Sequence, residues 1–255
     1  MARVDYEKMA PRYDAARALA RDGLADWRRA VERWLPESRP VRIADVGAGT
    51  GLFACAFADW FDAIVIGIEP SSRMREQALA KSRHEHVWYA GGDAERIPLR
   101  NGSCDVVWLS TVIHHVPDLA RCARETRRIL RRGGRVLIRS AFPGRLEHVS
   151  LFRFFPGARK VAESFPTVEA TVAAFASAGL SMQALESVAQ VSARSMREGL
   201  ERVRLRADST LAALDDEEFA RGLAAIAEAA RLETTPSPIV DRLDLLVLGE
   251  PASPA

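Results

Sequence analysis

Short β-branched runs alternate with helix-like segments through the middle of the chain. The runs that predict strands are Arg42 to Val46, Ala63 to Glu69, Val87 to Ala90, Asp105 to Ser110 and Gly134 to Ala141. Between them, apolar residues recur at helical spacing in Gly51 to Trp60, Ser72 to Ser82 and Leu119 to Leu130. This alternation is typical of βαβ units, so we expect an α/β fold with a doubly wound, mostly parallel sheet.

Helical and strand patterns also flank this core. Before it, Tyr6 to Leu35 predicts helices with the apolar residues Leu19, Leu24, Trp27, Val31 and Trp34. Gly133 and Gly134 are expected to stop the last core helix and open the next strand. After the core we expect a helix over 167–178, a strand over 180–191, and helices over 195–207 and 215–232. The apolar run Ile239 to Leu248 contains charged residues, which predicts a closing strand near the edge of the sheet.

The chain is long enough for one sizeable core. Its 255 residues predict a helical flank or lid over 1–40 and one main domain over 41–250, with an insertion at about 142–166 that forms the substrate pocket. Hydrophobic residues make up 48% of the chain and charged residues 27%, a balance typical of globular proteins. The abundance of Arg and Ala over Lys suggests a GC-rich bacterial genome.

Charge and cysteine content exclude several partners. The net charge of +2, from 36 basic and 34 acidic residues, is too small to favour nucleic acid as a partner. Three cysteines without C-x-x-C spacing predict neither disulfides nor a metal site, which fits a cytoplasmic protein. The chain contains neither a signal-peptide pattern near its start nor an apolar stretch long enough for a bilayer, so we expect no membrane association. Both a monomer and a homodimer remain open.

A glycine-rich segment follows the first predicted strand. The order is Gly47-Ala48-Gly49-Thr50-Gly51, and a helical pattern begins directly after it. This strand, loop and helix order is typical of nucleotide-type cofactor sites. A dinucleotide fingerprint would place its third glycine at position 52, where this chain has Leu52. A nicotinamide oxidoreductase is therefore a distant alternative.

The stretch Ala44 to Gly51 resembles the first motif of class I S-adenosylmethionine-dependent methyltransferases. The resemblance implies that the backbone of Gly47, Ala48, Gly49 and Gly51 contacts the methionine part of the cofactor, and that Asp45 orients its amine. It implies the fold of that family, a seven-stranded Rossmann-like sheet. S-adenosyl-L-homocysteine is then the product.

Further motifs follow in the family's order. Glu69 ends the second strand, where its two oxygens can accept both ribose hydroxyls. Gly92-Asp93-Ala94 resembles the third motif, which implies that Asp93 binds the adenine amino group and the N–H of Ala94 binds a ring nitrogen. By the same resemblance, five more residues line the cofactor: Pro70, Met74, Leu109, Ser110 and Thr111. Residues 101–107 and 131–138 resemble the turns into the fourth and fifth strands.

Some candidate residues have two interpretations. Tyr6 to Asp14 is similar to the family's N-terminal helix, so Tyr13 is either a cofactor ligand or a packing residue, and Arg17 is a weaker candidate. His114 and His115 follow the fourth strand, where a neutral imidazole can act as a base. Family members also carry this histidine without using it as a base, so the catalytic role is an alternative to a structural one.

Aromatic and basic clusters are also ambiguous. Phe142, Phe152, Phe154 and Phe155, with Arg145 and His148, predict either the wall of a substrate pocket or part of the core. Five arginines are expected to form a solvated helix face: Arg121, Arg124, Arg128, Arg131 and Arg132.

The predicted function is methyl transfer from S-adenosyl-L-methionine to an oxygen, nitrogen or carbon atom of a small molecule. The near-neutral charge and the compact chain favour a small acceptor over a macromolecule. One alternative keeps the fold and the cofactor but transfers no methyl group, and instead catalyses a reaction such as cyclisation or acts as an interaction module.

Overall fold

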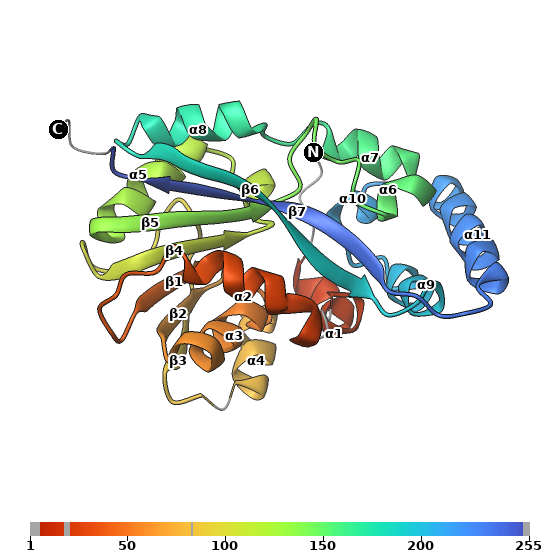
Figure 1. Ribbon diagram of the computed structural model, residues 1–255, viewed down its shortest axis with the longest axis horizontal. Coiled ribbons are helices and arrows are strands. Elements are labelled where there is room, and N and C mark those ends of the chain that lie inside the picture. The colour runs from red at the N-terminus through yellow and green to blue at the C-terminus, as the bar shows by residue number, and fades with distance from the viewer. Residues whose placement is uncertain (1–5, 18–20, 83, 252–255) are drawn as a thin grey trace. The chain divides into compact units, whose positions relative to one another are not determined.

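The computed structural model describes residues 6–17, 21–82 and 84–251, and these fall into two compact units. The first unit contains residues up to Arg29, Ala141–Phe165 and Ser187–Leu243. The second unit contains Ala30–Ser140, Pro166–Glu186 and the residues from Asp244 onward. Figure 1 labels the elements of both units. Predicted residue Leu19 and most of the C-terminal tail lie outside the described residues.

Parallel strands form the centre of the second unit. They are β1 (Arg42–Val46), β2 (Ile64–Ile68), β3 (Val87–Ala90), β4 (Cys104–Ser110) and β5 (Leu130–Ser140). Their order within the described seven-stranded sheet is β3-β2-β1-β4-β5-β7-β6. Most residues of β1 and β4 are buried, as expected for strands covered on both faces. The predicted doubly wound, mostly parallel sheet is confirmed.

Helices connect the parallel strands. They are α3 (Leu52–Phe61), α4 (Ser72–Lys81) and α5 (Leu119–Ile129), and α8 (Val168–Ala176) packs beside α5. Helices α3 and α4 connect β1 to β2 and β2 to β3, so these crossovers run toward the β3 side of β1. Helix α5 connects β4 to β5, so its crossover runs in the opposite direction. Right-handed crossovers in opposite directions place helices on opposite faces of a sheet. Figure 1 shows α3 and α4 near β1–β3, and α5 with α8 near β5.

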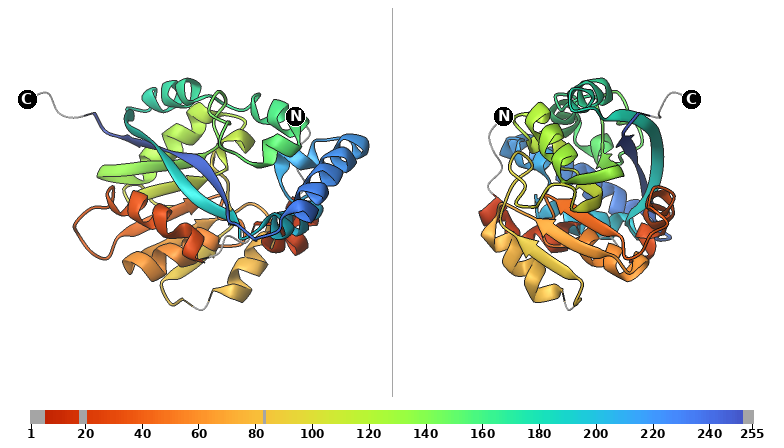
Figure 2. Two further views of the ribbon diagram at one scale, coloured as in Figure 1. Left: turned by 45° about the vertical axis from the view of Figure 1, so that its right-hand side comes forward. Right: turned by 90° about the vertical axis from the view of Figure 1, so that its left-hand side faces the viewer.

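Strand β7 (Ile239–Gly249) does not close the edge of the sheet, which corrects the sequence prediction. It pairs antiparallel with β5, from Arg135↔Gly249 to Ser140↔Asp244, and β6 (Ser181–Ala193) is the edge strand beyond it. Figure 2 shows these two strands as a long ribbon. Of the charged residues that suggested an edge, Asp241 and Asp244 are buried. The final strand is therefore an interior strand.

The glycine pair has a different role from the predicted one. Helix α5 ends at Ile129, and β5 begins at Leu130, before Gly133 and Gly134. The pairing of β4 with β5 shifts between Cys104↔Leu130 and Val106↔Arg135. Gly133 has φ +77°, and a Cβ on Gly134 would lie 2.9 Å from the carbonyl oxygen of Asp105. The glycines therefore form an irregularity inside β5 rather than a helix stop.

Helices make up most of the first unit. They are α1 (Tyr6–Arg17), the 3-10 turn η1 (Arg21–Leu24), α6 (Leu151–Phe154), α7 (Pro156–Ala162), α9 (Met196–Arg204), α10 (Ser209–Ala212) and α11 (Asp216–Leu232), and α2 (Ala25–Glu32) begins in this unit. The helix predicted over 195–207 is shorter in the structure, since α9 ends at Arg204. A cluster around Phe152, Phe155 and Leu211 joins α6, α7 and α10.

Candidate functional site

The glycine turn after β1 adopts a backbone that only glycines accommodate easily. Gly47, Gly49 and Gly51 have φ values of +75°, +55° and +83°. The N–H of Gly47 donates to the carbonyl oxygen of Ile68 over 2.8 Å, which ties the turn to the end of β2. A Cβ on Gly47 would lie 2.3 Å from Cγ2 of Val112. The turn therefore lies between β1 and β4, where the strand order reverses and where such sheets bind ligands.

Asp45 is a buried acid next to this turn. Its exposed fraction is 2%, and its pKa is raised to about 7, mainly by burial and also by the negative charge of Glu69. A hydrogen bond from the backbone N–H of Ala54 opposes this rise. A cationic group placed between the two carboxylates would favour ionised Asp45, because an opposite charge nearby stabilises the charged form.

Glu69 connects the glycine turn to the start of α4. It is 6% exposed, its Oε2 accepts the N–H of Gly49 over 2.9 Å, and its Oε1 accepts the N–H of Ser71 over 3.0 Å. Nη1 of Arg75 donates to the carbonyl oxygens of Glu69 and Pro70 over 2.6 and 2.9 Å. This carboxylate is thus held in place at the strand end.

The other predicted contacts lie at the carboxyl ends of the same strands. The register Val46↔Ile68, Val46↔Leu109 and Ile68↔Ala90 aligns the carboxyl ends of β1–β4. Asp93 comes three residues after the end of β3 and therefore lies near this same edge of the sheet. Asp93 is exposed, and Ala94 is buried. Met74 and Leu109 are 1% and 0% exposed, and Pro70 is exposed. A direct role for these residues stays a prediction.

The residue after β4, Thr111, was predicted to line the cofactor, but the sequence did not predict its strained backbone. Thr111 has φ +53°, which is a rare conformation for a β-branched residue, and its N–H donates to the carbonyl oxygen of Arg139 over 2.7 Å. Such strain concentrates at functional sites. The bend directs the chain so that the next residue, Val112, reaches Gly47. A β-branched residue at a strand end carries no sequence signal for this bend.

Arg139 is a residue at this edge that the sequence analysis passed over. It is 6% exposed, and its Nη1 donates to Oγ of Ser110 over 3.0 Å. Its guanidinium lies 5.5 Å from the ring centroid of Phe53. An arginine near the end of an otherwise apolar strand was the available signal, because a buried charge in a sheet is uncommon.

His114 and His115 lie in the 3-10 turn η2 (Ile113–His115) after Thr111. Their ring centroids are 4.0 Å apart, His114 is half-buried and His115 is exposed. The structure thus places both imidazoles directly after the carboxyl end of β4. Their predicted role as a base stays a prediction.

Several candidate residues lie in the first unit. Tyr13 lies in α1, 6.3 Å from Tyr6 between ring centroids. The side chain of Arg17 lies outside the described residues. Phe142, Phe152 and Phe155 are buried, and the last two pack in the core cluster with α10, which favours the core interpretation for them.

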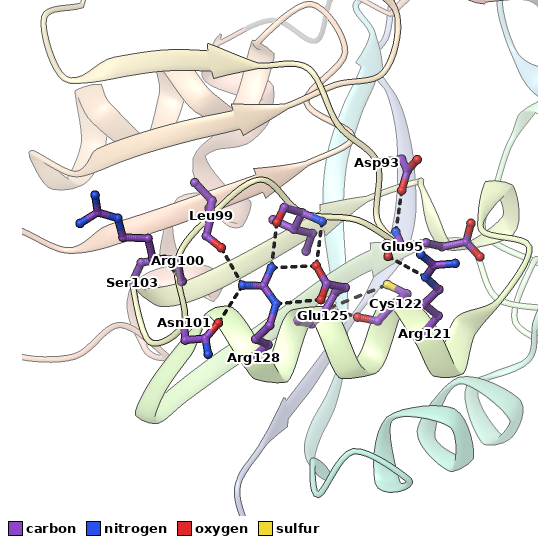
Figure 3. Close-up of polar contacts among 12 residues, drawn as sticks. Asp93, Glu95, Leu99, Arg100, Asn101, Ser103, Arg121, Cys122, Glu125 and Arg128 are labelled. Atoms are coloured by element: carbon purple, nitrogen blue, oxygen red, sulfur yellow. Dashed lines mark hydrogen bonds and ion pairs between the residues drawn. The ribbon is translucent and has the colours of Figure 1, made fainter.

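The predicted solvated arginine face is confirmed for Arg121 and Arg124, which are exposed on α5, but not for the half-buried Arg128. Arg131 and Arg132 lie in β5 and not on the helix. Nε of Arg121 donates to the carbonyl oxygen of Glu95 over 2.9 Å, and Arg131 lies 3.0 Å from Asp105. Arg128 forms an ion pair with Glu125 and donates to carbonyl oxygens of the loop between β3 and β4, as Figure 3 shows. Sequence periodicity indicated the helix face but not the loop that covers it.

Neither a metal cluster nor a membrane-spanning helix is found among the described residues. Within residues 6–17, 21–82 and 84–251, no three or more His, Cys, Asp or Glu side chains are arranged to hold a metal ion. In the same part of the chain, no helix has the length and apolar character needed to cross a membrane.

Known proteins that resemble this chain in sequence are methyltransferases. Residues 44–138 match the family model described as "Methyltransferase domain". The chain is 28% identical over 133 residues to a demethylmenaquinone methyltransferase of Roseiflexus sp. (strain RS-1), covering 51% of this chain and 56% of the relative. It is 33% identical over 108 residues to the 27-O-demethylrifamycin SV methyltransferase of Amycolatopsis mediterranei, covering 41% and 40%. The match thus spans about half the length of these relatives.

Solved structures share the fold. A putative methyltransferase from an antibiotic biosynthesis pathway of Anabaena variabilis has a TM-score of 0.64 at 21% identity, covering 89% of this chain and 99% of that chain. The cyclase SpnF has a TM-score of 0.60 at 20% identity, covering 90% and 82%. At these identities the likeness concerns the fold alone.

Proposed function

We propose that the chain is a class I S-adenosylmethionine-dependent methyltransferase and that it methylates a small-molecule acceptor. The observation that carries the proposal is the pair of buried carboxylates, Asp45 and Glu69, on either side of a glycine turn. A cofactor with one ammonium group and a ribose diol fits this pair, since a carboxylate can bind either group.

Named residues would hold each part of the cofactor. The Asp45 carboxylate would bind the ammonium of the methionine part, beside the backbone of Gly47, Ala48, Gly49 and Gly51. The Glu69 oxygens would accept both ribose hydroxyls, in addition to the N–H groups that they already bind.

The adenine and the methionine carboxylate would have further contacts. Asp93 and Ala94 would bind the polar edge of the adenine, and Met74 would pack beside its ring. Pro70, Leu109 and Ser110 would complete this wall of the site. Tyr13 of α1 would bind the carboxylate.

Catalysis by this chain would consist mainly of alignment. The bound cofactor supplies an electrophilic methyl carbon on a sulfonium, and the protein places the acceptor atom in line with it. His114 or His115 would take the proton of a hydroxyl or amine acceptor. The position of both histidines directly after β4 supports this assignment.

A small acceptor is supported by charge balance and by relatives. The formal charge of +2 supplies little attraction for nucleic acid. The two curated relatives are named for demethylmenaquinone and 27-O-demethylrifamycin SV, which are small molecules. The three cysteines are free, which supports a cytoplasmic location. We extend the proposal to a monomer or homodimer in that compartment.

Calorimetric titration with S-adenosylmethionine tests the proposal first. Saturable binding is expected, and the absence of both heat and a thermal shift at saturating cofactor would contradict it. NADH serves as the control ligand. Release of S-adenosylhomocysteine with a panel of phenol, amine and enolate acceptors then tests the transfer itself.

A second candidate is a reaction without methyl transfer on the same fold. The fold likeness to the cyclase SpnF favours keeping this alternative. It predicts cofactor binding without S-adenosylhomocysteine release while an acceptor is converted. Mass analysis of the product separates the two cases, because only methyl transfer adds a methyl group.

A further inference from the structure

An ion pair on helix α5, Glu125–Arg128, forms hydrogen bonds with the loop between β3 and β4. Nε and Nη2 of Arg128 donate to the two carboxylate oxygens of Glu125, each over 2.7 Å. The same guanidinium donates to the carbonyl oxygens of Ile97 and Leu99, over 2.8 and 2.6 Å, and to Oδ1 of Asn101 over 3.0 Å. Figure 3 shows that these contacts surround the guanidinium.

The part of the loop that this ion pair binds is a tight turn centred on Pro98. Oε2 of Glu125 accepts the N–H of Ile97 over 2.9 Å, and the N–H of Leu99 donates to the carbonyl oxygen of Ile97 over 2.8 Å. This bond between residues two apart closes a γ-type turn. Arg128 and Glu125 therefore bind the backbone on both sides of Pro98.

The Pro98 turn contacts the residue before Asp93. A Cβ on Gly92 would lie 2.7 Å from Cδ of Pro98, so the proline ring lies directly against Gly92. Movement of the turn would therefore displace Gly92 and, through the peptide bond, Asp93. This contact links Arg128 to a residue that it does not itself touch.

The start of the same segment is also tied to α5. Oδ1 of Asp93 accepts the N–H of Glu95 over 2.9 Å. Oε1 of Glu95 accepts the N–H of Asp118, and Nε of Arg121 donates to the carbonyl oxygen of Glu95, each over 2.9 Å. Both ends of the loop are thus fixed to one helix.

We propose that Glu125 and Arg128 are positioning residues for the adenine end of the cofactor site. They hold the Pro98 turn, and the turn holds Gly92 so that Asp93 and Ala94 meet the adenine edge. A planar guanidinium can bind the carboxylate and two carbonyl groups at once, whereas a lysine ammonium lacks this fixed fork. The inference rests on the proposed function, which assigns Asp93 and Ala94 to adenine.

The test uses a matched pair of variants, Arg128→Ala and Arg127→Ala. Arg127 is the neighbouring residue of α5 and also forms an ion pair, 2.5 Å from Glu250 at the end of β7. Exposed side-chain fractions are similar, 30% for Arg128 and 37% for Arg127. Loss of either pair removes a comparable surface interaction, but only Arg128 contacts the Pro98 turn.

The readout is discrimination between two ligands that differ at the adenine amino group. Calorimetry gives the dissociation constants of S-adenosylhomocysteine and S-inosylhomocysteine, which carries an oxo group in place of the amino group. Wild type is expected to prefer the adenosyl ligand by about tenfold or more, the effect of one hydrogen bond to a charged acceptor. In Arg128→Ala the preference should fall to about twofold, whereas Arg127→Ala should keep it.

Each outcome decides the inference. If Arg128→Ala lowers the melting temperature but keeps the wild-type preference, the residue is only structural and the inference is wrong. If Arg128→Ala does not fold, Arg128→Lys and Glu125→Gln give the same comparison. A wild type that binds both ligands equally also overturns the inference. A wild type that binds neither ligand contradicts the proposed function instead.

Discussion

Replacement of Asp45 by asparagine should stabilise the protein without cofactor and weaken cofactor binding. The buried carboxyl has a pKa of about 7, above its ordinary value of 3.8. In the folded protein the neutral form is therefore favoured, and ionisation near pH 8 occurs at a cost to stability. Asparagine has nearly the same shape, stays neutral, and can accept the same hydrogen bond from Ala54.

The magnitude follows from the difference between the two pKa values. The interval from 3.8 to about 7 corresponds to about 4 kcal/mol. Because the folded pKa is raised, the favourable contribution of Asp45 is fully present below pH 3.8 and is lost as pH rises through about 7. Above that pH, the unfolding free energy of Asp45→Asn should exceed that of wild type by the full amount. Near pH 5 the difference between the two proteins should be roughly half as large.

Thermal unfolding across this pH range measures the effect. An advantage of about 4 kcal/mol corresponds to a rise in melting temperature on the order of 10 °C for a chain of this size. Asp62→Asn, at an exposed position after α3, is the matched control and should show no such trend. The reasoning fails if Asp45→Asn is not more stable than wild type near pH 8, or if its advantage does not shrink on acidification.

Three further changes test other parts of the site. Gly47→Ala should lower the free energy of unfolding by about 1–3 kcal/mol more than Gly102→Ala, the usual cost of overpacking. Both glycines have positive φ and share the conformational cost, but a Cβ meets a side chain at 2.3 Å on Gly47 and nothing described within 4 Å on Gly102. Equal melting temperatures would refute this. Glu69→Gln should weaken S-adenosylmethionine binding about 10- to 100-fold by calorimetry, the cost of a charged hydrogen bond; unchanged affinity would remove Glu69 from the site. If either histidine is a base, His114→Ala or His115→Ala should lower kcat about 100-fold or more with cofactor affinity unchanged; full rates in both variants would leave catalysis to alignment.

Much of the fold and part of the site could be predicted from the sequence. The bounds of β1 and β3 agree with the prediction, because apolar runs between turn residues are local signals. Glu69 and Asp93 could be placed at one edge before the structure was known, since parallel strands align their carboxyl ends. Gly51, in place of a glycine at position 52, distinguished the motif from a dinucleotide fingerprint.

Other features depend on contacts between distant segments. Strand β7 lies between β5 and β6 because its backbone pairs with both of these strands. The sequence did not predict this, since an apolar run that contains charged residues can form either an edge strand or an interior strand.

The sequence by itself determined the order of the core strands and helices, the glycine turn and the resemblance to methyltransferases. Only the tertiary structure showed that burial beside Glu69 raises the pKa of Asp45, that Thr111 is strained, and that Arg128 holds a loop instead of facing solvent. The physical reason is that periodicity reports which face of an element is apolar. The energy of a charged or polar side chain depends on the partners that the fold brings to it.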